Sequence, residues 1–277
     1  MENYSVLMSV YIEEDPEHFA AAIQSMLDQT VVTNDFVIVC DGPLTPELDA
    51  VVDAFISRYP GLFQIVRLPE NVGVGQSAKA GLAACRNDLI AKMDSDDISV
   101  PDRCEKQLVR FAANPELTLL GGIIEEFDNR TGKVISIRST AVDYDGIRRY
   151  ARRRSPVNNV TAMYRKSAAM ACGGYRQLRR AEDYDLYLRM LIRGYYAENL
   201  PETLVKVRVD TDAHRRRASW STLKCCAGIW WYAWREGFSS LADLLICIGG
   251  QVFLILCPGP VQQMIYKTFL RRKHKPE

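Results

Sequence analysis

The chain has 277 residues and a mass of 31.4 kDa, with 48% hydrophobic, 25% charged and 9% aromatic residues. These values are typical of a globular protein, and they exclude a disordered, collagenous or wholly coiled-coil chain. The length allows one large domain, alone or with a C-terminal appendage.

Charge is distributed unevenly along the chain, although the formal net charge is only +1. Residues 1–137 contain 10 Lys and Arg against 22 Asp and Glu, whereas residues 138–277 contain 25 against 12. A basic second half indicates an anionic partner. Phosphate groups, a membrane surface, nucleic acid and the acidic first half of the chain itself all remain open as that partner.

Cysteine usage and the N-terminus bear on the compartment. The eight cysteines include no Cys-x-x-Cys pair, which argues against a zinc site of the common spacing. The segment Met1–Tyr4 lacks the basic region and the long apolar run of a secretory signal. We therefore expect a protein of the reducing cytoplasm.

The first hundred residues alternate between strand and helix signals. Asp15-Pro16 and Thr45-Pro46 each place a capping side chain before a proline at the first helical position. Strands are expected at 6–11, 36–40, 63–68 and 89–93, and helices after Asp15, after Thr45 and over 73–85. Apolar strands that alternate with helices predict an α/β fold with a mostly parallel sheet covered on both faces.

The second part of the chain is less regular. We expect strands at 117–127, 134–137 and 160–164, a hairpin turn at 129–133 and a helix at 181–193. Residues 148–154 contain five arginines. From about Trp220 onward an aromatic-rich helix is expected, followed by a mostly apolar run at 241–257.

The apolar run 241–257 leaves three alternatives open. It is shorter than the roughly 20 residues that a membrane-spanning helix requires, and it contains Asp243. It could still span a membrane, pack against the rest of the protein or a partner, or insert into the membrane interface. We favour the interface, because the aromatic cluster before the run and the basic end after it suit a lipid surface.

Carboxylates follow three of the four predicted strands of the first half. In an open α/β sheet, ligands bind beyond the carboxyl ends of the strands, so these groups are expected to meet at one edge. Asp41 follows the second strand, Glu70 the third, and the segment Asp94-Ser95-Asp96-Asp97 the fourth. This pattern predicts a cation or a polyhydroxyl ligand at that edge.

The segment 94–97 is the strongest of these signals. Two carboxylates separated by one residue can share Mg²⁺ or Mn²⁺, which prefer oxygen ligands and keep positions open for phosphate and water. Such a cation would neutralise a diphosphate leaving group. The alternative is that these acids cap the helix expected after Ser99-Val100-Pro101.

A second acidic cluster, Glu182, Asp183 and Asp185, stands at the start of the helix predicted for 181–193. Ordinary helix capping would explain acids at this place. The neighbouring Arg179 and Arg180 also suit a carboxylate that serves as a general base in a polar setting.

Together these residues resemble the inverting family 2 glycosyltransferases of the GT-A fold. The resemblance covers about residues 4–210 and rests on five segments in matching order: Ser9-Val10-Tyr11, Asp41, 69–75, 93–98 and 181–186. It implies a GT-A catalytic domain at 1–215, with a nucleotide-binding half at 1–100 and an acceptor half at 101–215, and a helical tail at 216–277. The tail resembles bacterial enzymes that build capsular or exopolysaccharide repeat units.

The resemblance also implies roles for individual residues. Asp183 would be the general base, with Glu182 orienting the site. Asp96 would bind Mn²⁺ or Mg²⁺, and Asp94 would lie near the ribose and donor sugar, within reach of the same cation. The remaining donor contacts would come from Ser9, Tyr11, Glu13, Asp41 (at the nucleobase, expected to be uracil), Asn71 and Lys79, the last standing where the family often has Asn.

Two features near residue 215 complete the expected site. His214 would add a ligand to the metal, as a histidine at this place does in some relatives. Arg216, within Arg215-Arg216-Arg217, would bind the pyrophosphate of a donor or of a lipid-linked acceptor, because arginine forks suit phosphate oxygens. A solvated basic loop is the alternative for these arginines.

The expected function is metal-dependent, inverting transfer of a hexose from a nucleotide-diphosphate sugar, with UDP as the expected nucleotide. The acceptor would be a glycan or a polyprenyl-diphosphate-linked sugar at the inner face of the plasma membrane, in cell-surface polysaccharide synthesis. A nucleotidyltransferase is one alternative, although Tyr11–Asp15 occupies the place of its glycine- and arginine-rich loop. A degenerate nucleotide-sugar-binding subunit is another alternative. Such a subunit would be expected to lack Asp96 or Asp183, and both are present here. Base-reading motifs are lacking, which argues against nucleic acid.

Overall fold

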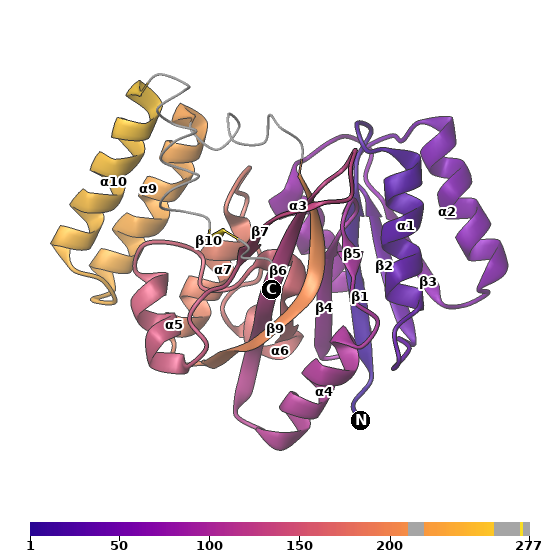
Figure 1. Ribbon diagram of the computed structural model, residues 1–277, viewed down its shortest axis with the longest axis horizontal. Helices are drawn as coiled ribbons and strands as arrows, with labels where there is room; N and C mark the ends of the chain where they lie inside the picture. Colours follow the sequence, from indigo (N-terminus) through magenta and orange to yellow (C-terminus); the bar gives the residue numbers. More distant parts are fainter. Residues whose placement is uncertain (210–218, 258–271, 274–277) are drawn as a thin grey trace.

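The structure is a computed structural model that describes residues 1–209, 219–257 and, for the backbone only, 272–273 (Figure 1). His214, Arg216 and the segments 258–271 and 274–277 lie outside the described residues.

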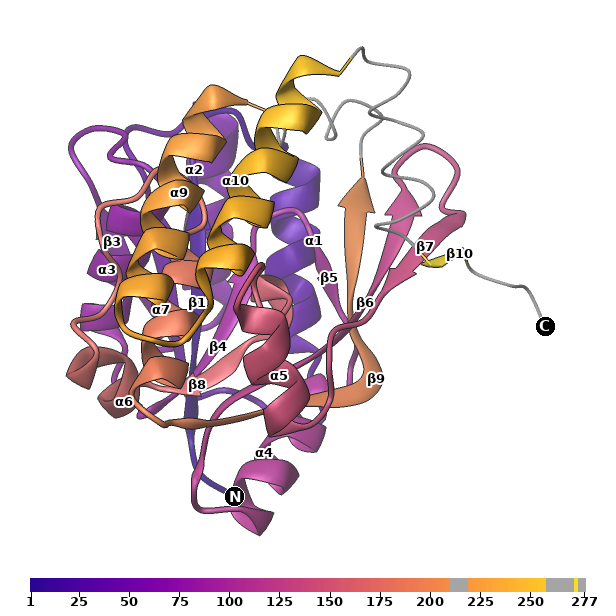
Figure 2. The same ribbon diagram turned by 90° about the vertical axis from the view of Figure 1, so that its left-hand side faces the viewer.

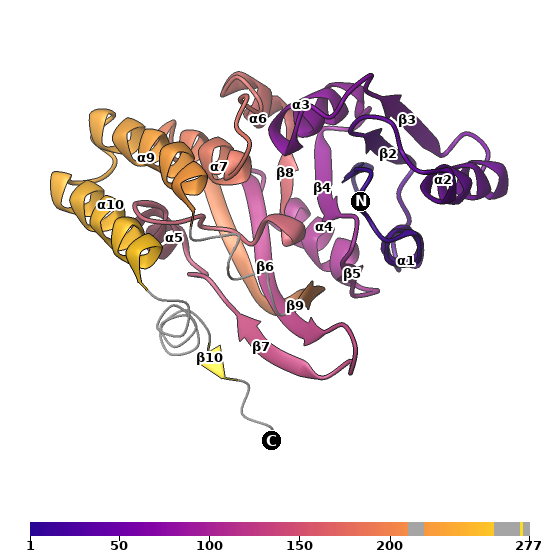
Figure 3. The same cartoon turned by 90° about the horizontal axis from the view of Figure 1, so that it is seen from above.

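One mixed sheet runs through the molecule (Figure 3). Its parallel part has the order β3-β2-β1-β4, formed by β1 (Tyr4–Val10), β2 (Asp35–Cys40), β3 (Phe63–Arg67) and β4 (Leu89–Asp94). Antiparallel pairing continues the sheet from β4 through β8 (Met163–Arg165) and β6 (Leu117–Asp128) to β7 (Val134–Arg138). β9 (Tyr196–Val209) pairs in parallel with β6, and two short strands, β5 (Ile98–Ser99) and β10 (Arg272–Lys273), pair with β9 and β7.

Helices cover both faces of this sheet, as the sequence predicts. Side chains of β1 alternate between two cores, because successive residues of a strand point to opposite faces: Val6 and Met8 enter one core and Leu7 the other. The first core is closed by α1 (Pro16–Leu27), α2 (Pro46–Arg58) and α4 (Arg103–Ala113). The second core is closed by α3 (Val74–Ala84), α5 (Tyr144–Ala151), α6 (Lys166–Ala171), α7 (Glu182–Ile192) and α9 (Trp220–Arg235).

The predicted starts of the first two helices are confirmed. Asp15 accepts hydrogen bonds from the backbone N–H groups of Glu17 and His18, and Thr45 accepts one from Leu48. The strand expected at 160–164 is partly wrong, because a 3₁₀ turn, η1 (Asn159–Thr161), precedes β8. Thr161 Oγ1 donates to the carbonyl of Asn158 at 2.7 Å, and this local bond competes with an extended backbone.

Two glycines allow loops at the carboxyl edge of the sheet to approach closely. A Cβ on Gly42, whose φ is +90°, would lie 2.8 Å from the backbone nitrogen of Asn71, so the loops after β2 and β3 meet there. A Cβ on Gly75 would lie 2.6 Å from the carbonyl oxygen of Leu178. The start of α3 therefore packs directly against the segment that leads to Arg179 and Arg180.

The helices α9 and α10 (Leu241–Leu256) form a hairpin at one side of the molecule (Figure 2). Trp230 of α9 is buried, and its indole Nε1 donates to the carbonyl of Arg153 at 3.2 Å. Asp243 of α10 forms an ion pair with Arg153 at 2.7 Å. The hairpin thus holds the segment that follows α5. Among the described helices, none combines the length and the apolar character needed to cross a bilayer.

Candidate active site

Two adjoining cavities open at the carboxyl ends of the parallel strands. The first cavity, of about 730 Å³, lies between the ends of β1, β2 and β4 and the start of α7. The second cavity, of about 600 Å³, lies between β4, β7, β9 and the segment 154–160. Asp94, Asp96 and Asn159 line both. The cavities therefore meet at the two aspartates that the sequence singles out.

Most of the residues expected to hold the nucleotide-sugar lie together on the first cavity. Ser9 is held in place at the end of β1 by Ser77 of α3, whose hydroxyl donates to Ser9 Oγ at 2.9 Å. Lys79 does not line either cavity, because it lies on the exposed side of α3, opposite the face that is buried through Ala78 and Leu82. The expected residues that do line the first cavity are Ser9, Tyr11, Glu13, Asp41, Asn71 and Asp94.

Asp41 is buried and has a definite structural partner. Its carboxylate accepts hydrogen bonds from the backbone N–H groups of Val72 at 2.8 Å and Gly73 at 3.1 Å. Asn71 Nδ2 donates to the Asp41 carbonyl at 3.3 Å. Asp41 therefore shapes the loop after β3. A carboxylate offers about four lone-pair sites, so two bonds leave acceptor capacity for a ligand N–H.

The acids of the segment 94–97 have distinct surroundings. Asp97 is buried and accepts a hydrogen bond from the backbone N–H of Arg208 at 2.9 Å. Burial, together with the charges of Asp94 and Glu14, raises the pKa of Asp96 to about 7. The helix α4 has Asp102 as its N-cap residue, so these acids do not cap it and the capping alternative fails.

The fit of a divalent cation follows from the donor set. Among the described residues, no three His, Cys, Asp or Glu side chains are grouped closely enough to hold a metal by themselves. Asp94 and Asp96 nonetheless supply two oxygen donors at the mouth shared by the two cavities. The raised pKa of Asp96 reflects burial and the negative charges of Asp94 and Glu14, which the charge of Arg208 offsets only in part. This arrangement suits Mg²⁺ or Mn²⁺ when phosphate and water fill the other positions.

Two charged residues of the first cavity, besides those expected from the sequence, lie close to the segment 94–97. Lys92 is buried within β4, and its Nζ lies 3.6 Å from Asp94 Oδ1. Glu14 accepts a hydrogen bond from Ser95 Oγ at 2.5 Å. A lysine inside the apolar run 89–93 is the signal by which Lys92 could have been found, because an unpaired buried ammonium group is costly.

Glu182 and Asp183 begin α7 and face different cavities. Glu182 lines the first cavity, and Asp183 lines the second, where Ser155 Oγ donates to Asp183 Oδ2 at 3.5 Å. The preceding Ala181 has a φ of +60°, a strained conformation for a residue with a Cβ. The N-cap residue Ala181 supplies no side-chain bond, and the two acids lie in the first turn, where the helix dipole also favours negative charge.

The surroundings of the two acids disfavour their charged forms. Burial, followed by the charge of Asp183, raises the pKa of Glu182 to about 8. Burial also raises the pKa of Asp183. Asp185, the third acid of the cluster, is instead paired with Arg189 at 2.7 Å in the interior, where it stabilises the fold. Carboxyl groups with raised pKa values are suited to proton transfer near neutral pH.

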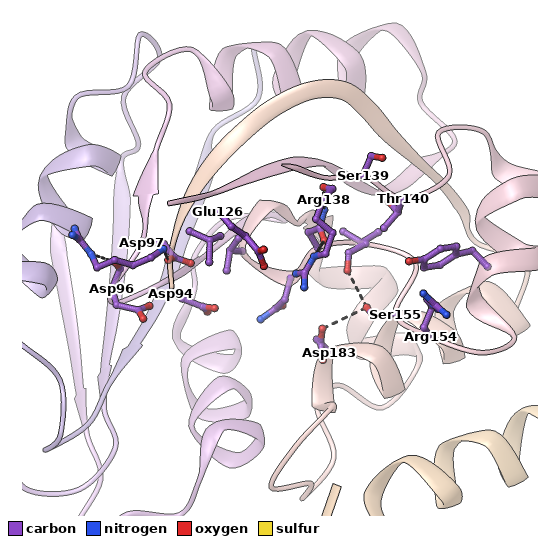
Figure 4. A pocket seen from close by; sticks show the side chains of 17 residues that line it. Asp94, Asp96, Asp97, Glu126, Arg138, Ser139, Thr140, Arg154, Ser155 and Asp183 are labelled. Carbon is purple, nitrogen blue, oxygen red and sulfur yellow. Dashed lines mark hydrogen bonds between the residues drawn. The ribbon is translucent and has the colours of Figure 1, made fainter. Parts of the chain in front are cut away.

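Charged side chains line the second cavity along its whole length (Figure 4). The aspartates of residues 94–97 lie at one end, and Arg154 lies at the other. Glu126, Arg138 and Asp183 lie between them. A ligand in this cavity would therefore meet carboxylates and the guanidinium group of Arg208 near the first cavity, and the guanidinium group of Arg154 far from it.

The fold and the site define a class of protein: an α/β enzyme with two cavities at the carboxyl ends of parallel strands and carboxylates at their junction. Comparison with known proteins gives the family. The sequence profile described as "Glycosyl transferase family 2" matches residues 5–183. The chain belongs to this family, and it is a glycosyltransferase.

Two curated relatives match over most of their length. The amylovoran biosynthesis glycosyltransferase AmsE of Erwinia amylovora is 35% identical over 80% of this chain and 82% of its own. A UDP-Gal:alpha-D-GlcNAc-diphosphoundecaprenol beta-1,3-galactosyltransferase of Escherichia coli is 31% identical over 97% of each chain.

A solved structure shows the same fold. The mannosyltransferase PcManGT from Pyrobaculum calidifontis, in complex with GDP-Man and Mn²⁺, superposes with a TM-score of 0.66 over 96% of this chain and 79% of its own, at 13% identity. The expected GT-A fold, a mostly parallel sheet flanked by helices with further helices at the C-terminal end, is thereby confirmed.

Proposed function

We propose that this glycosyltransferase moves a hexose from a UDP-sugar to a lipid-linked or glycan acceptor, with inversion at the anomeric carbon. The observation that carries the proposal is the junction of the two cavities at Asp94 and Asp96, with Asp183 on the wall of the second. The donor would occupy the first cavity and the acceptor the second. The anomeric carbon would then lie at their junction.

Residues of the first cavity would bind the donor. Asp41 would accept the N3–H of uracil while it holds the loop after β3, and Ser9, Tyr11, Glu13 and Asn71 would line the nucleotide. Lys92, whose Nζ lies 3.6 Å from the Asp94 carboxylate, would stabilise negative charge close to Asp94. Asp96, with Asp94, would hold Mn²⁺ or Mg²⁺, which when bound supplies positive charge to the leaving diphosphate.

Asp183 would act as the general base. It would accept the proton of an acceptor hydroxyl while that oxygen attacks the anomeric carbon and UDP departs from the opposite face. The bond from Ser155 would orient the carboxylate, and the raised pKa of Asp183 would favour its taking up the proton. Glu182, on the first cavity, would orient the donor.

The relatives support the substrates. The Escherichia coli relative is described as using UDP-Gal and a diphosphoundecaprenol-linked GlcNAc, and the Erwinia amylovora relative is assigned to amylovoran biosynthesis. We propose the same class of chemistry for this chain: a UDP-sugar donor and an acceptor that is built up on a lipid carrier during polysaccharide synthesis.

The exposed side of α10 supports action at a membrane surface. Leu245 and Phe253 on this side are 61% and 58% exposed, and Asp243, the one charged residue of α10, is buried. An apolar helix face of this kind suits the interface of the cytoplasmic leaflet. We expect the double change Leu245→Glu and Phe253→Glu to reduce sedimentation with vesicles of anionic lipids. The matched changes Val109→Glu and Met170→Glu, at apolar residues 51% exposed elsewhere on the surface, should leave it unchanged.

The central test is release of UDP from a panel of UDP-sugars by the purified protein with Mn²⁺, with and without a lipid-linked GlcNAc acceptor. One donor should be consumed, and the acceptor should accelerate its consumption. Calorimetric titration with UDP and Mn²⁺ on the same sample should show binding. No release from any donor, together with no binding of UDP, would refute the proposed donor.

A further inference from the structure

The five arginines of residues 148–154 have different structural roles. Arg148 donates to the carbonyl of Leu191 at 2.7 Å, and Arg153 is paired with Asp243. Both therefore stabilise the packing around α5. Arg149 and Arg152 are exposed and line neither cavity. Arg154 is the member of this group that lines the second cavity.

Arg154 is exposed, and its guanidinium group lies against an aromatic ring. Its Cζ lies 5.3 Å from the centroid of the Tyr150 ring, and Tyr150 lines the same cavity. Stacking of this kind orients the guanidinium plane. Within the described part of the chain, Arg154 forms no ion pair with a carboxylate. The next residue, Ser155, contacts Asp183. The positively charged Arg154 is thus the sequence neighbour of Ser155, which would position the proposed general base, Asp183.

Arg138 approaches the same cavity from a different element, the end of β7. Its Nε donates to Asn158 Oδ1 at 2.8 Å, which orients the rest of the guanidinium group. In Figure 4, Arg138 lies on one side of the pair Asp183 and Ser155, and Arg154 lies on the other side. Two arginines from separate elements therefore flank the place where an acceptor hydroxyl would meet Asp183.

We propose that Arg154, assisted by Arg138, binds the phosphate attached to the acceptor sugar, so that the acceptor is recognised as a lipid-linked glycosyl diphosphate. This inference rests on the proposed function. With an acceptor hydroxyl at Asp183, the phosphate on the anomeric carbon of the same sugar lies one ring away from it. Arginine forks match phosphate oxygens in a bidentate manner.

The donor diphosphate is a poor occupant for this arginine pair. In the proposed function it would lie with the cation held by Asp94 and Asp96, and Arg154 lies at the opposite end of the cavity. The α9–α10 hairpin also holds the segment 150–155, through Trp230 and through the pair of Arg153 with Asp243. The hairpin therefore lies against the segment that carries Arg154.

The test compares two acceptors that carry the same GlcNAc and the same short alkyl chain, one joined through a diphosphate and the other directly as a glycoside. For Arg154→Gln we expect at least about a tenfold rise in KM for the diphosphate acceptor, since a charge-assisted bidentate contact is lost. The kcat/KM for the neutral glycoside and the acceptor-free hydrolysis of the donor should not change. Arg152→Gln, an exposed arginine two residues away, is the matched control and should behave like the wild type.

A binding experiment separates this inference from the proposed function. The enzyme is saturated with UDP and Mn²⁺ and titrated with an alkyl diphosphate or with inorganic pyrophosphate. The alkyl diphosphate should bind the wild type more tightly than Arg154→Gln and more tightly than pyrophosphate binds. Equal binding to both proteins would overturn the inference, and pyrophosphate binding as tightly would overturn the lipid-linked source. A wild type that uses both GlcNAc acceptors equally well would also overturn it while leaving the glycosyltransferase reaction intact. Failure to bind UDP would refute the proposed donor instead.

Discussion

Asp96 links cation binding to pH. Its pKa is about 7 in the absence of a metal, because the carboxyl group is buried and close to Asp94 and Glu14. A cation binds the deprotonated carboxylate, so protons compete with it below pH 7. With this pKa, about 0.9 of the Asp96 groups carry a proton at pH 6 and about 0.1 at pH 8. The apparent Kd for Mn²⁺ should therefore be about tenfold higher at pH 6 than at pH 8.

Isothermal titration calorimetry would measure this effect in two buffers with different ionisation enthalpies. Nucleotide should be left out, because phosphate groups titrate in the same pH range. We expect release of close to one proton per Mn²⁺ at pH 6 and little release at pH 8. Asp96→Asn should abolish the pH-dependent binding, and Asp102→Asn, at the half-exposed N-cap residue of α4, should preserve it. A Kd that changes less than twofold between pH 6 and pH 8 would refute the expected coupling between protonation of Asp96 and metal binding.

Three further predictions concern the site. Asp183→Asn should lower kcat by at least about 100-fold, the contribution of a positioned base, with UDP binding by calorimetry unchanged; equal turnover would remove Asp183 from the mechanism. Gly75→Ala should lower the free energy of unfolding in urea by about 1–3 kcal/mol and raise the donor KM, because its Cβ would push on the segment before Arg179; wild-type stability would contradict the close packing. In the metal-free protein the raised pKa of Glu182 lowers the stability as pH rises from about 5 to 8, so the Tm should fall over that range. The Tm of Glu182→Gln should fall less over the same range. If the Tm of the variant and that of the wild type fall in parallel with pH, Glu182 is not the cause.

Much of the fold can be predicted from the sequence, because the sequence signals for helices and strands are local. The caps at Asp15 and Thr45, the apolar strands and the helix periodicity depend on neighbours within a few residues. Parallel topology then brings the strand ends to one edge, so Asp41 and Asp94 could be expected on one cavity. The family resemblance added Asp183. Even the position of Lys79, away from the cavities, could have been read from the buried periodicity of α3.

Only the tertiary structure decided which groups meet across long stretches of chain. Asp97 accepts a bond from Arg208, 111 residues away, and the role of Arg153 depends on Asp243 in the hairpin. Within the run 148–154 the sequence offers five equivalent arginines, and the placement of α5 against the α9–α10 hairpin leaves Arg154 on the second cavity. The physical reason is that a side chain's local pattern sets the face it occupies, whereas its partner is set by the packing of elements distant in sequence.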